Sequence, residues 1–274
     1  MKHTDIKNYT LDVKHVFGTY EWAEQNANFI TGCKHNCKYC YSKEMAIRFG
    51  RKTAKDWSNE IIRKKNLNKK FRKVEGTIMF PSSHDITPKH LKQSIIFLRN
   101  ILHEGNKVLI VTKPHIKCIE KICDEFVDFK DKILFRFTIG SCNSNILKFW
   151  EPGAPDFKER LNSLKLAYNM GYETSVSCEP MLDGKIDILI NKVQKYVTNS
   201  IWLGKANSLL KRLKTNCTND KETIIQANKL IRLQSDDIIL KVYRKYKNNS
   251  IIKWKESIKS VVGLQVSVEK GLDI

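Results

Sequence analysis

The sequence lacks any long apolar run. No stretch in its 274 residues approaches the roughly 18 consecutive apolar residues that a membrane-spanning helix needs. Residues 1–22 show no signal-peptide pattern, and the chain has neither an internal repeat of fixed period nor a low-complexity tract. Because 41% of the residues are hydrophobic, the chain can still bury a sizeable core. We therefore expect a soluble, cytoplasmic protein with no membrane contact.

Acidic residues are scarce relative to basic ones. The chain has 29 Asp and Glu against 49 Lys and Arg, which gives a formal net charge of +20. A basic excess of this size attracts polyanions, so nucleic acid is the partner that the composition predicts. The alternative is a merely basic surface, because the richness in Lys, Asn and Ile is typical of an AT-rich coding genome.

Cysteine is too sparse for a secreted disulfide framework in a chain of this length. Of the eight cysteines, Cys33, Cys37 and Cys40 fall in one short segment and the other five are scattered. This distribution indicates a metal or redox site in a reducing compartment.

Short apolar runs alternate with helical periodicity up to residue 207. Strands are expected at 28–31, 77–80, 107–112, 133–139, 174–177 and 200–203, and helices at 42–49, 57–65, 88–102, 116–126, 156–170 and 186–196. In the third helix, Thr87 is expected to be the N-cap, before Pro88. This alternation predicts an α/β protein with a parallel sheet, either a partial (β/α) barrel or an open doubly wound sheet. In both, ligands gather at the C-terminal ends of the strands.

The pattern changes after residue 207. The remaining segment is rich in lysine, with helices expected at 221–233 and 251–259. We predict a barrel over 1–207 and a basic, mostly helical C-terminal extension over 208–274 that packs on the barrel or closes it.

The three clustered cysteines have the spacing CxxxCxxC. Three thiolates on a tight loop can bind three irons of a cuboidal cluster and leave a fourth iron open. A structural zinc site normally has four ligands, and no obvious fourth partner lies nearby. The alternatives are a zinc knuckle that uses His35, or cysteines unrelated to any metal.

The motif CxxxCxxC, followed by an aromatic residue and placed after a first strand, resembles the radical S-adenosylmethionine (SAM) superfamily. The cysteine loop GCKHNCKYCY (32–41) is similar to that of the spore photoproduct lyase and DNA repair photolyase branch. The segments VTK (111–113), RFTI (136–139) and FWEPGAP (149–155) also resemble that branch. The resemblance implies a partial (β/α)6 TIM-like barrel. It also implies a 4Fe–4S cluster on Cys33, Cys37 and Cys40.

The resemblance further implies that SAM binds the open iron. One-electron reduction, by a donor such as flavodoxin or ferredoxin, would cleave SAM to a 5′-deoxyadenosyl radical that abstracts hydrogen from a substrate. Tyr41 would pack near the cluster and SAM, Lys113 would contact the SAM carboxylate or ribose, and Ser177 would lie near the adenine. The full set of expected cofactor-binding residues is Tyr39, Tyr41, Ser82, Ser83, Asp85, Lys113, Thr138, Ser177 and Glu179.

Two departures from the branch affect the predicted reaction. Many members hold the SAM amino group with a Gly-Gly-Glu stretch, for which Ser82, Ser83 or Asp85 would have to substitute. Ser82 also stands where the lyase has a hydrogen-donating cysteine, and a serine O–H bond is too strong for that role. Cys142, Cys178 and Tyr41 are the remaining catalytic candidates, although both cysteines could simply be small buried residues.

We therefore predict a radical SAM enzyme that acts on nucleic acid or a nucleotide, in repair or modification. The rival hypotheses are radical modification of a peptide or small metabolite, and a non-catalytic cluster- or zinc-containing nucleic-acid-binding protein. Basic residues at 63–73 and 211–247, with Tyr243, Tyr246 and Trp254 interleaved, could contact phosphates and stack on bases. They could equally form solvated helix faces with the aromatic rings turned inward. The discriminating feature is whether the basic residues converge on the mouth of the barrel.

Three further residues have two interpretations each. His84 and His115 follow predicted strands and could transfer protons, or could be polar surface residues. Glu151 could orient the substrate or the SAM ribose, or could be a solvated surface carboxylate.

Overall fold

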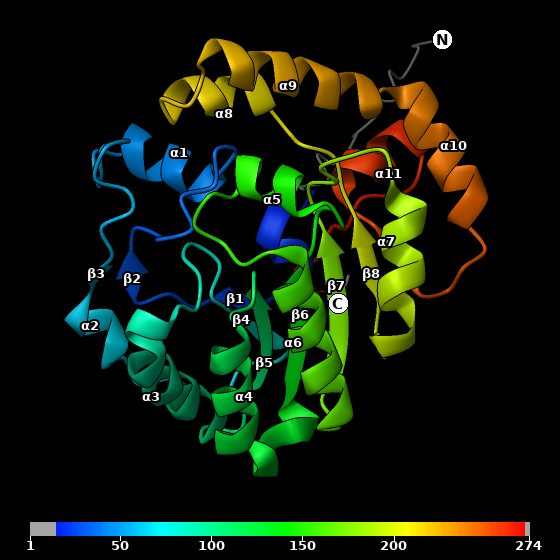
Figure 1. Cartoon of the computed structure of the whole chain (residues 1–274). Coiled ribbons are helices and arrows are strands. Elements are labelled where there is room, and N and C mark those ends of the chain that lie inside the picture. Colours follow the sequence, from blue (N-terminus) through cyan, green and yellow to red (C-terminus); the bar gives the residue numbers. More distant parts are fainter. Residues whose placement is uncertain (1–14, 272–274) are drawn as a thin grey trace, which may run out of the picture.

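The computed structural model describes residues 15–271, and its centre is a seven-stranded sheet in the order β1-β4-β5-β6-β7-β8-β9. Its strands are β1 Gln25–Asn26, β4 Thr77–Phe80, β5 Lys107–Thr112, β6 Ile133–Thr138, β7 Glu173–Cys178, β8 Ile201–Leu203 and β9 Ile252–Trp254. Every neighbouring pair is parallel, and β1 and β9 are free edges. The sheet is thus a partial barrel that does not close, as predicted (Figure 1).

Helices follow most of the strands and cover the outer face of the sheet (Figure 1). They are α3 Leu91–Leu102, α4 Ile116–Glu125, α6 Phe157–Asn169 and α7 Ile186–Val193. Successive strand residues belong to different apolar clusters: Ile110 and Phe135 pack in the large outer core, whereas Leu109 and Leu134 pack in a smaller inner cluster with Trp202. Because both faces are buried, the strands have continuous apolar sequences.

Local sequence signals explain several element boundaries. The side chain of Asp156 caps α6 by accepting a hydrogen bond from the backbone N–H of Glu159 at 2.9 Å. Thr87 occupies the predicted N-cap position before Pro88, but its side chain makes no capping hydrogen bond. The chain instead enters α3 through the 3₁₀ helix η2, Pro88–His90.

Two predictions before β4 are wrong. Residues 28–31 do not supply the first strand of the sheet: β2, Ile30–Thr31, pairs antiparallel with β3, Ile61–Ile62, and the polar pair in β1 takes the sheet edge. Residues 57–65 do not form one helix, because β3 interrupts them before the short α2, Lys64–Leu67. Both differences arise from pairing between segments distant in sequence, which local periodicity does not report.

The C-terminal region contributes to the sheet as well as covering it. Its helices are α8 Leu209–Thr215, α9 Lys221–Leu233, α10 Asp236–Tyr246 and α11 Glu256–Val262. The helix predicted at 221–233 is confirmed, but 251–259 is wrong, because β9 precedes α11 and pairs with β8. Figure 1 shows α8 and α9 above the C-terminal ends of the strands, near α1, Tyr41–Arg48, and α5, Ser144–Trp150. None of the helices within residues 15–271 has the length and apolar character to cross a membrane.

Candidate functional site

A cavity of about 410 Å³ lies at the C-terminal ends of the strands. Its wall combines the cysteine loop, the ends of β4 to β7, the N-terminal 3₁₀ helix η1 (Gly18–Glu21) and residues of the C-terminal extension. All the cluster and cofactor-binding residues expected from the sequence line it: Cys33, Cys37, Tyr39, Cys40, Tyr41, Ser82, Ser83, Asp85, Lys113, Thr138, Ser177 and Glu179. Residues from five separate segments thus face one space.

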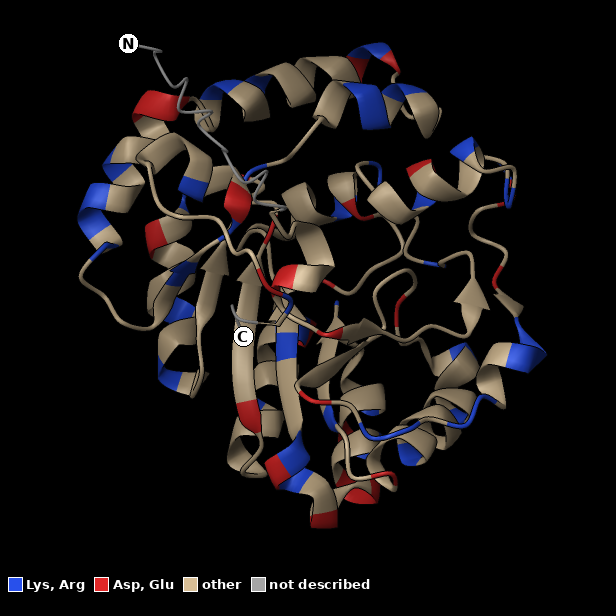
Figure 2. Cartoon of the chain, turned by 180° about the vertical axis from the view of Figure 1, so that it is seen from behind, with Lys and Arg blue, Asp and Glu red and all other residues tan. Residues whose placement is uncertain are grey.

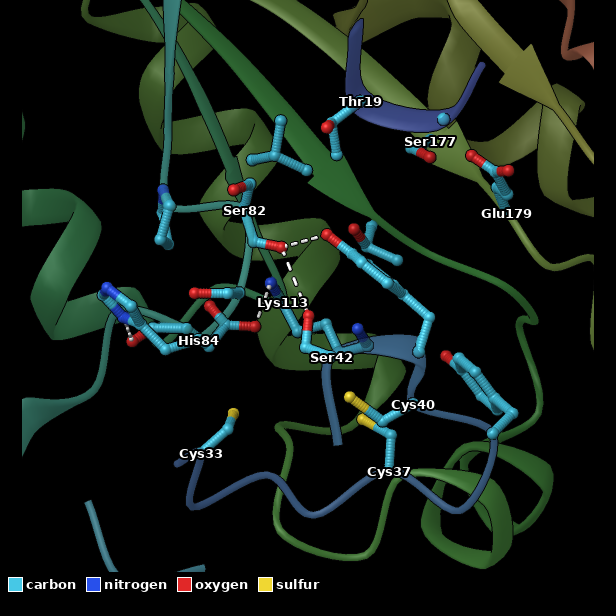
Figure 3. Close-up of a pocket in the computed structure, with 18 of the residues that line it drawn as sticks. Thr19, Cys33, Cys37, Cys40, Ser42, Ser82, His84, Lys113, Ser177 and Glu179 are labelled. Carbon is cyan, nitrogen blue, oxygen red and sulfur yellow. Dashed lines mark hydrogen bonds between the residues drawn. The ribbon is translucent and has the colours of Figure 1, made fainter. Parts of the chain in front are cut away.

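The three cysteines lie at one end of this cavity. Figure 3 shows Cys33, Cys37 and Cys40 opposite Thr19, Ser177 and Glu179. Among residues 15–271, no three His, Cys, Asp or Glu side chains lie close enough together to share one metal ion. A zinc knuckle that uses His35 would need such a group, whereas a cluster needs one thiolate for each of three irons.

The groups around the thiols shift the thiol pKa values in opposite directions. Burial raises the pKa of Cys37 to about 12, while the ammonium group of Lys113 opposes that shift. The Cys40 sulfur accepts a hydrogen bond from the backbone N–H of Lys43 at 3.4 Å. Neighbouring N–H and ammonium groups of this kind favour thiolates, the form that binds iron. Burial still raises the pKa of all three thiols, so the fit to the cluster that the motif implies rests on their spacing and on the cavity that they share.

Two glycines let other segments approach the cysteine loop closely. A Cβ atom on Gly32, whose φ is +98°, would lie 2.7 Å from the carbonyl oxygens of Trp57 and Asn59. A Cβ atom on Gly153 would lie 2.3 Å from the carbonyl oxygen of Lys34. The backbone N–H of Gly153 donates to the carbonyl oxygen of His35 at 3.0 Å. The loop is thus clamped from two sides by backbone contacts.

Glu151 is a fully buried carboxylate beneath this loop. It accepts a hydrogen bond from the hydroxyl of Tyr39, lies 2.5 Å from the guanidinium of Arg160 and 3.9 Å from Nζ of Lys113. Burial alone would raise the pKa of Glu151, but Arg160 and Lys113 bring it below its usual value. Glu151 therefore ties the loop to the end of β5 and to α6. The interpretation of Glu151 as a solvated surface carboxylate is wrong, because the residue is fully buried, whereas a role in orienting the substrate or the SAM ribose stays a prediction.

The turn after β4 is held by a residue that sequence reasoning missed. The side-chain oxygen of Asn28 accepts the backbone N–H groups of Ser82 and Ser83 at 2.8 and 2.9 Å. Its amide group donates to the hydroxyl of Ser82 at 2.8 Å. From the cavity side, the hydroxyl of Tyr41 donates to the carbonyl oxygen of Ser82 at 2.6 Å (Figure 3). Nothing in the sequence around Asn28 distinguishes it from the chain's many other asparagines.

Asp85 lies further along the same wall of the cavity, where its carboxylate links several segments by hydrogen bonds. Its carboxylate accepts the hydroxyl of Thr112 and the backbone N–H groups of Lys113 and Ile86, the latter two at 3.1 and 2.8 Å. The Nδ1 atom of His35 lies 3.0 Å from it. Burial would raise the pKa of Asp85, but His35 and Lys113 hold it well below its usual range. Because the oxygens of Asp85 and the polar groups of Ser82 are already engaged, the hydroxyl of Ser83 is the freer polar group in this part of the wall.

The opposite end of the cavity contains a buried lysine that the sequence did not single out. Lys255 follows β9 and its side chain is 1% exposed; its Nζ lies 3.2 Å from Glu21, 3.8 Å from Glu179 and 3.7 Å from Glu256. Nζ also donates to the carbonyl oxygen of Gly18 at 3.0 Å. Burial and the hydrogen bond to Glu256 raise the pKa of Glu21, whereas Lys255 lowers it. Lys255 therefore joins the C-terminal extension to η1 across the sheet.

Every lysine and arginine that lines the cavity is paired with a carboxylate. Lys113 lies near Glu151, Lys255 lies near the three glutamates just named, and Nε of Arg212 is 3.6 Å from Glu44. Figure 2 shows Lys and Arg spread over many helices and loops. The basic residues thus do not converge as free charge on the mouth.

The aromatic residues of the C-terminal extension face inward. The rings of Tyr243 and Trp254 make an edge contact with centroids 5.2 Å apart, and the hydroxyl of Tyr246 donates to Asp187 at 2.5 Å. These rings are therefore not a stacking platform for bases.

The two cysteines considered as hydrogen donors lie outside the cavity lining. Cys178 is fully buried, and its thiol faces the carbonyl oxygen of Gly140 at 3.8 Å. Cys142 is half-buried and packs against the apolar core. Their catalytic role stays a prediction that this placement does not support. His84 is buried between the rings of Phe29 and Phe80, and burial lowers its pKa to about 4.

The sequence model of one protein family matches the part of the chain that contains most of the segments lining this cavity. The sequence model of the Radical SAM superfamily matches residues 27–188. An uncharacterized protein of Acidianus two-tailed virus, ORF301, is 26% identical over 166 residues, which are 56% of this chain and 54% of the viral protein. The chain therefore spans about half the length of that relative.

Solved structures share the fold. A spore photoproduct lyase variant superposes with a TM-score of 0.54 at 15% identity, covering 77% of this chain and 65% of the lyase. Another variant, solved with bound AdoMet and a dinucleoside spore photoproduct, gives 0.53 at 16%, covering 77% and 66%. Streptococcus suis SuiB bound to S-adenosylmethionine gives 0.50 at 11% identity, covering 90% of this chain and 54% of SuiB. At these low sequence identities, each similarity concerns the fold alone.

Proposed function

Because this chain belongs to the radical SAM superfamily, we propose that it holds a 4Fe–4S cluster on Cys33, Cys37 and Cys40 and cleaves SAM to start a radical reaction. The observation that carries the proposal is the shared cavity: three thiols at one end and polar side chains from four strand ends along its wall. Bound together, the cluster and SAM would supply one-electron chemistry, a 5′-deoxyadenosyl radical that abstracts a hydrogen atom from the substrate.

The residues around the cavity have distinct roles in this proposal. Lys113 offers a buried positive charge to the SAM carboxylate; its pKa is raised despite burial, because Cys37, Glu151 and Asp85 favour its charged form. Ser82 and Ser83 accept or donate hydrogen bonds at the amino-acid end of SAM. Ser177 and Glu179 lie at the far end, where the ribose and adenine would extend. The surrounding protein positions SAM and excludes water from the radical.

We propose nucleic acid or a nucleotide as the substrate class. Support comes from the fold shared with a lyase solved with a dinucleoside photoproduct and from the overall net charge of +20, although the basic residues do not gather at the mouth of the cavity. Because the cations lining the cavity are already paired, the unit that reaches the radical would be an uncharged base or sugar, with phosphates outside on surface lysines. Ser82, in place of a thiol, argues against repair of the spore photoproduct itself.

The decisive experiment is anaerobic reconstitution of the cluster followed by addition of SAM and dithionite. We expect 5′-deoxyadenosine, formed faster when DNA or RNA is present. No 5′-deoxyadenosine from a protein with an intact cluster would overturn the radical proposal. A rate unaffected by nucleic acid but raised by a peptide would overturn the substrate class and favour peptide modification.

The cluster ligands have a matched control within the chain. Cys37→Ala should prevent reconstitution of a full 4Fe–4S cluster, whereas Cys217→Ala, at an exposed cysteine outside the cavity, should leave the iron content unchanged. Iron and sulfide analysis, with the visible absorbance of the cluster, distinguishes the two. A Cys37→Ala protein that still holds four irons would refute the ligand assignment.

A further inference from the structure

A second hollow, of about 440 Å³, opens on the outer surface where α4 and α6 begin. Its lining includes His115, Lys117, Asp156, Lys158 and Glu159. The proposed reaction at the first cavity makes no use of these residues. Both helices belong to the outer layer of the barrel (Figure 1), and no residue lines both this hollow and the first cavity.

A pair of histidines connects this hollow with the cysteine loop. Nε2 of His115 lies 3.0 Å from Nε2 of His35, and the two ring centroids are 5.1 Å apart. His35 sits in the loop between Cys33 and Cys37 and is 1% exposed, whereas the side chain of His115 is 22% exposed. On its other side, His35 contacts Asp85, which lines the first cavity. A continuous series of side-chain contacts therefore runs from the second hollow through the cluster loop to the first cavity.

The rim of the second hollow has free positive charge, unlike the first cavity. The carboxylate of Asp156 caps α6, and that of Glu159 accepts the backbone N–H of Ile116 at 3.1 Å and lies 3.8 Å from Nδ1 of His115. Both acidic groups are thus engaged within the protein. Lys117 and Lys158 are exposed, and neither forms an ion pair or hydrogen bond with any residue from 15 to 271. The hollow therefore presents two unpaired lysines to a partner, beside two carboxylates that are hydrogen-bonded within the protein.

We propose that this hollow is the docking site of an acidic one-electron carrier protein, and that His115 and His35 form the contact route from the carrier to the cluster loop. The inference rests on the proposed function, which needs one electron for each SAM cleavage. The reduced cofactor of the carrier loses that electron and the cluster gains it, with no bond formed or broken. The mouth of the first cavity is the entrance for the substrate, so a separate entry face lets the carrier and the substrate bind together.

Charge reversal on the rim tests the docking surface, with a flavodoxin as the carrier. In the double variant Lys117→Glu/Lys158→Glu we expect flavodoxin to bind about tenfold or more weakly and to reduce the cluster correspondingly more slowly at low concentration. The matched control is Lys229→Glu/Lys241→Glu, which makes the same change in net charge at exposed lysines on α9 and α10. Binding is measured by calorimetry, and cluster reduction by stopped-flow absorbance and by electron paramagnetic resonance.

Dithionite separates failure of the docking site from failure of the proposed function. Being small, it does not need the hollow, so the rim variant should be reduced by dithionite at the wild-type rate. If both double variants weaken flavodoxin binding equally, the docking site is wrong although the enzyme proposal stands. If dithionite yields a reduced cluster but no 5′-deoxyadenosine, the proposed function fails instead.

The histidine route has its own test. His115→Leu should leave flavodoxin binding within about twofold of wild type, because the lysines remain, but should slow reduction at saturating flavodoxin severalfold. The resonance spectrum of the dithionite-reduced variant serves as the control for an undistorted cluster. An unchanged rate at saturating flavodoxin would overturn the route through His115.

Discussion

At the scale of single residues, the cluster loop depends on side chains that its motif does not contain. Glu151, Asn28 and Asp85 are buried or half-buried polar groups whose partners come from distant segments. Each has its hydrogen-bonding groups engaged by the cysteine loop or by the strand ends beside it. Removing one of them would leave its partners desolvated and unpaired, which costs more than the original bond contributed.

Glu151→Ala should therefore destabilise the protein strongly. The change leaves the guanidinium of Arg160 and the ammonium of Lys113 buried without the carboxylate between them. We expect the free energy of unfolding, measured in urea, to fall by about 3–5 kcal/mol. Glu75→Ala, at an exposed glutamate, is the control and should change it by about 0.5 kcal/mol or less. Equal effects would contradict the bracing role of Glu151.

His84 should make the stability depend on pH. Burial lowers its pKa from 6.5 to about 4, so the folded protein favours the neutral ring while the unfolded chain takes up a proton more readily. The stabilisation is complete above pH 6.5 and is lost as the pH falls towards 4. Between pH 7.5 and 5 it amounts to about 2 kcal/mol.

The measurement compares urea unfolding at these two pH values in wild type and His84→Leu. The variant should lose about 2 kcal/mol of the pH dependence. Leucine at the exposed His103 is the control and should retain the wild-type dependence. Identical pH dependence in all three proteins would show that His84 is not buried as a neutral ring.

At the scale of elements, close backbone approach decides how the cysteine loop is held. The loop packs directly on the turn after α5, where Gly153 meets the carbonyl oxygen of Lys34. A glycine at this position has no special φ angle, so only the neighbouring backbone requires it. In the EPG tripeptide at 151–153, the carboxylate of Glu151 therefore holds the loop through hydrogen bonds and ion pairs. Gly153 lets the backbone of the loop pack closely against this turn.

Gly153→Ala should consequently disturb the cluster site. The added methyl group would overlap backbone atoms that cannot move aside, so we expect a loss of about 1–3 kcal/mol in stability and a lower iron content after reconstitution. Gly184→Ala is the matched control, because its Cβ atom would meet only the side chain of Leu233 at 3.4 Å. Full iron loading in both variants would contradict the close packing at Gly153.

At the scale of the whole molecule, the C-terminal region completes both the sheet and the site. β9 covers the edge of β8, and Lys255 at its end bonds to the N-terminal η1 across the cavity. The ammonium group of Lys255 lies within 4 Å of Glu21 and Glu179, which come from two other segments, and of the neighbouring Glu256. The division predicted at residue 207 thus separates parts that share one sheet.

A chain ending at Asn207 should therefore fail to fold cooperatively. It would lose β9 and the helices above the strands, and it would expose the edge of β8, where Ile201, Trp202 and Leu203 are buried. We expect a broad thermal transition by circular dichroism and poor solubility, against one sharp transition for the full chain. A sharp transition in the shortened chain would support an independent barrel.

The sequence by itself determined the parallel sheet and most strand positions, because apolar periodicity is a local property of the chain, and from the thiol spacing it predicted the three cluster ligands. It also identified the polar residues at strand ends, because parallel strands bring their C-terminal ends to one edge. Only the tertiary structure decided that β1 and β9 form the sheet edges, that Glu151 braces the loop, that Lys255 closes the cavity, and that His115 meets His35. All four features depend on contacts between segments far apart in sequence. A single buried charge or glycine in such a contact produces no periodic pattern that the sequence could show.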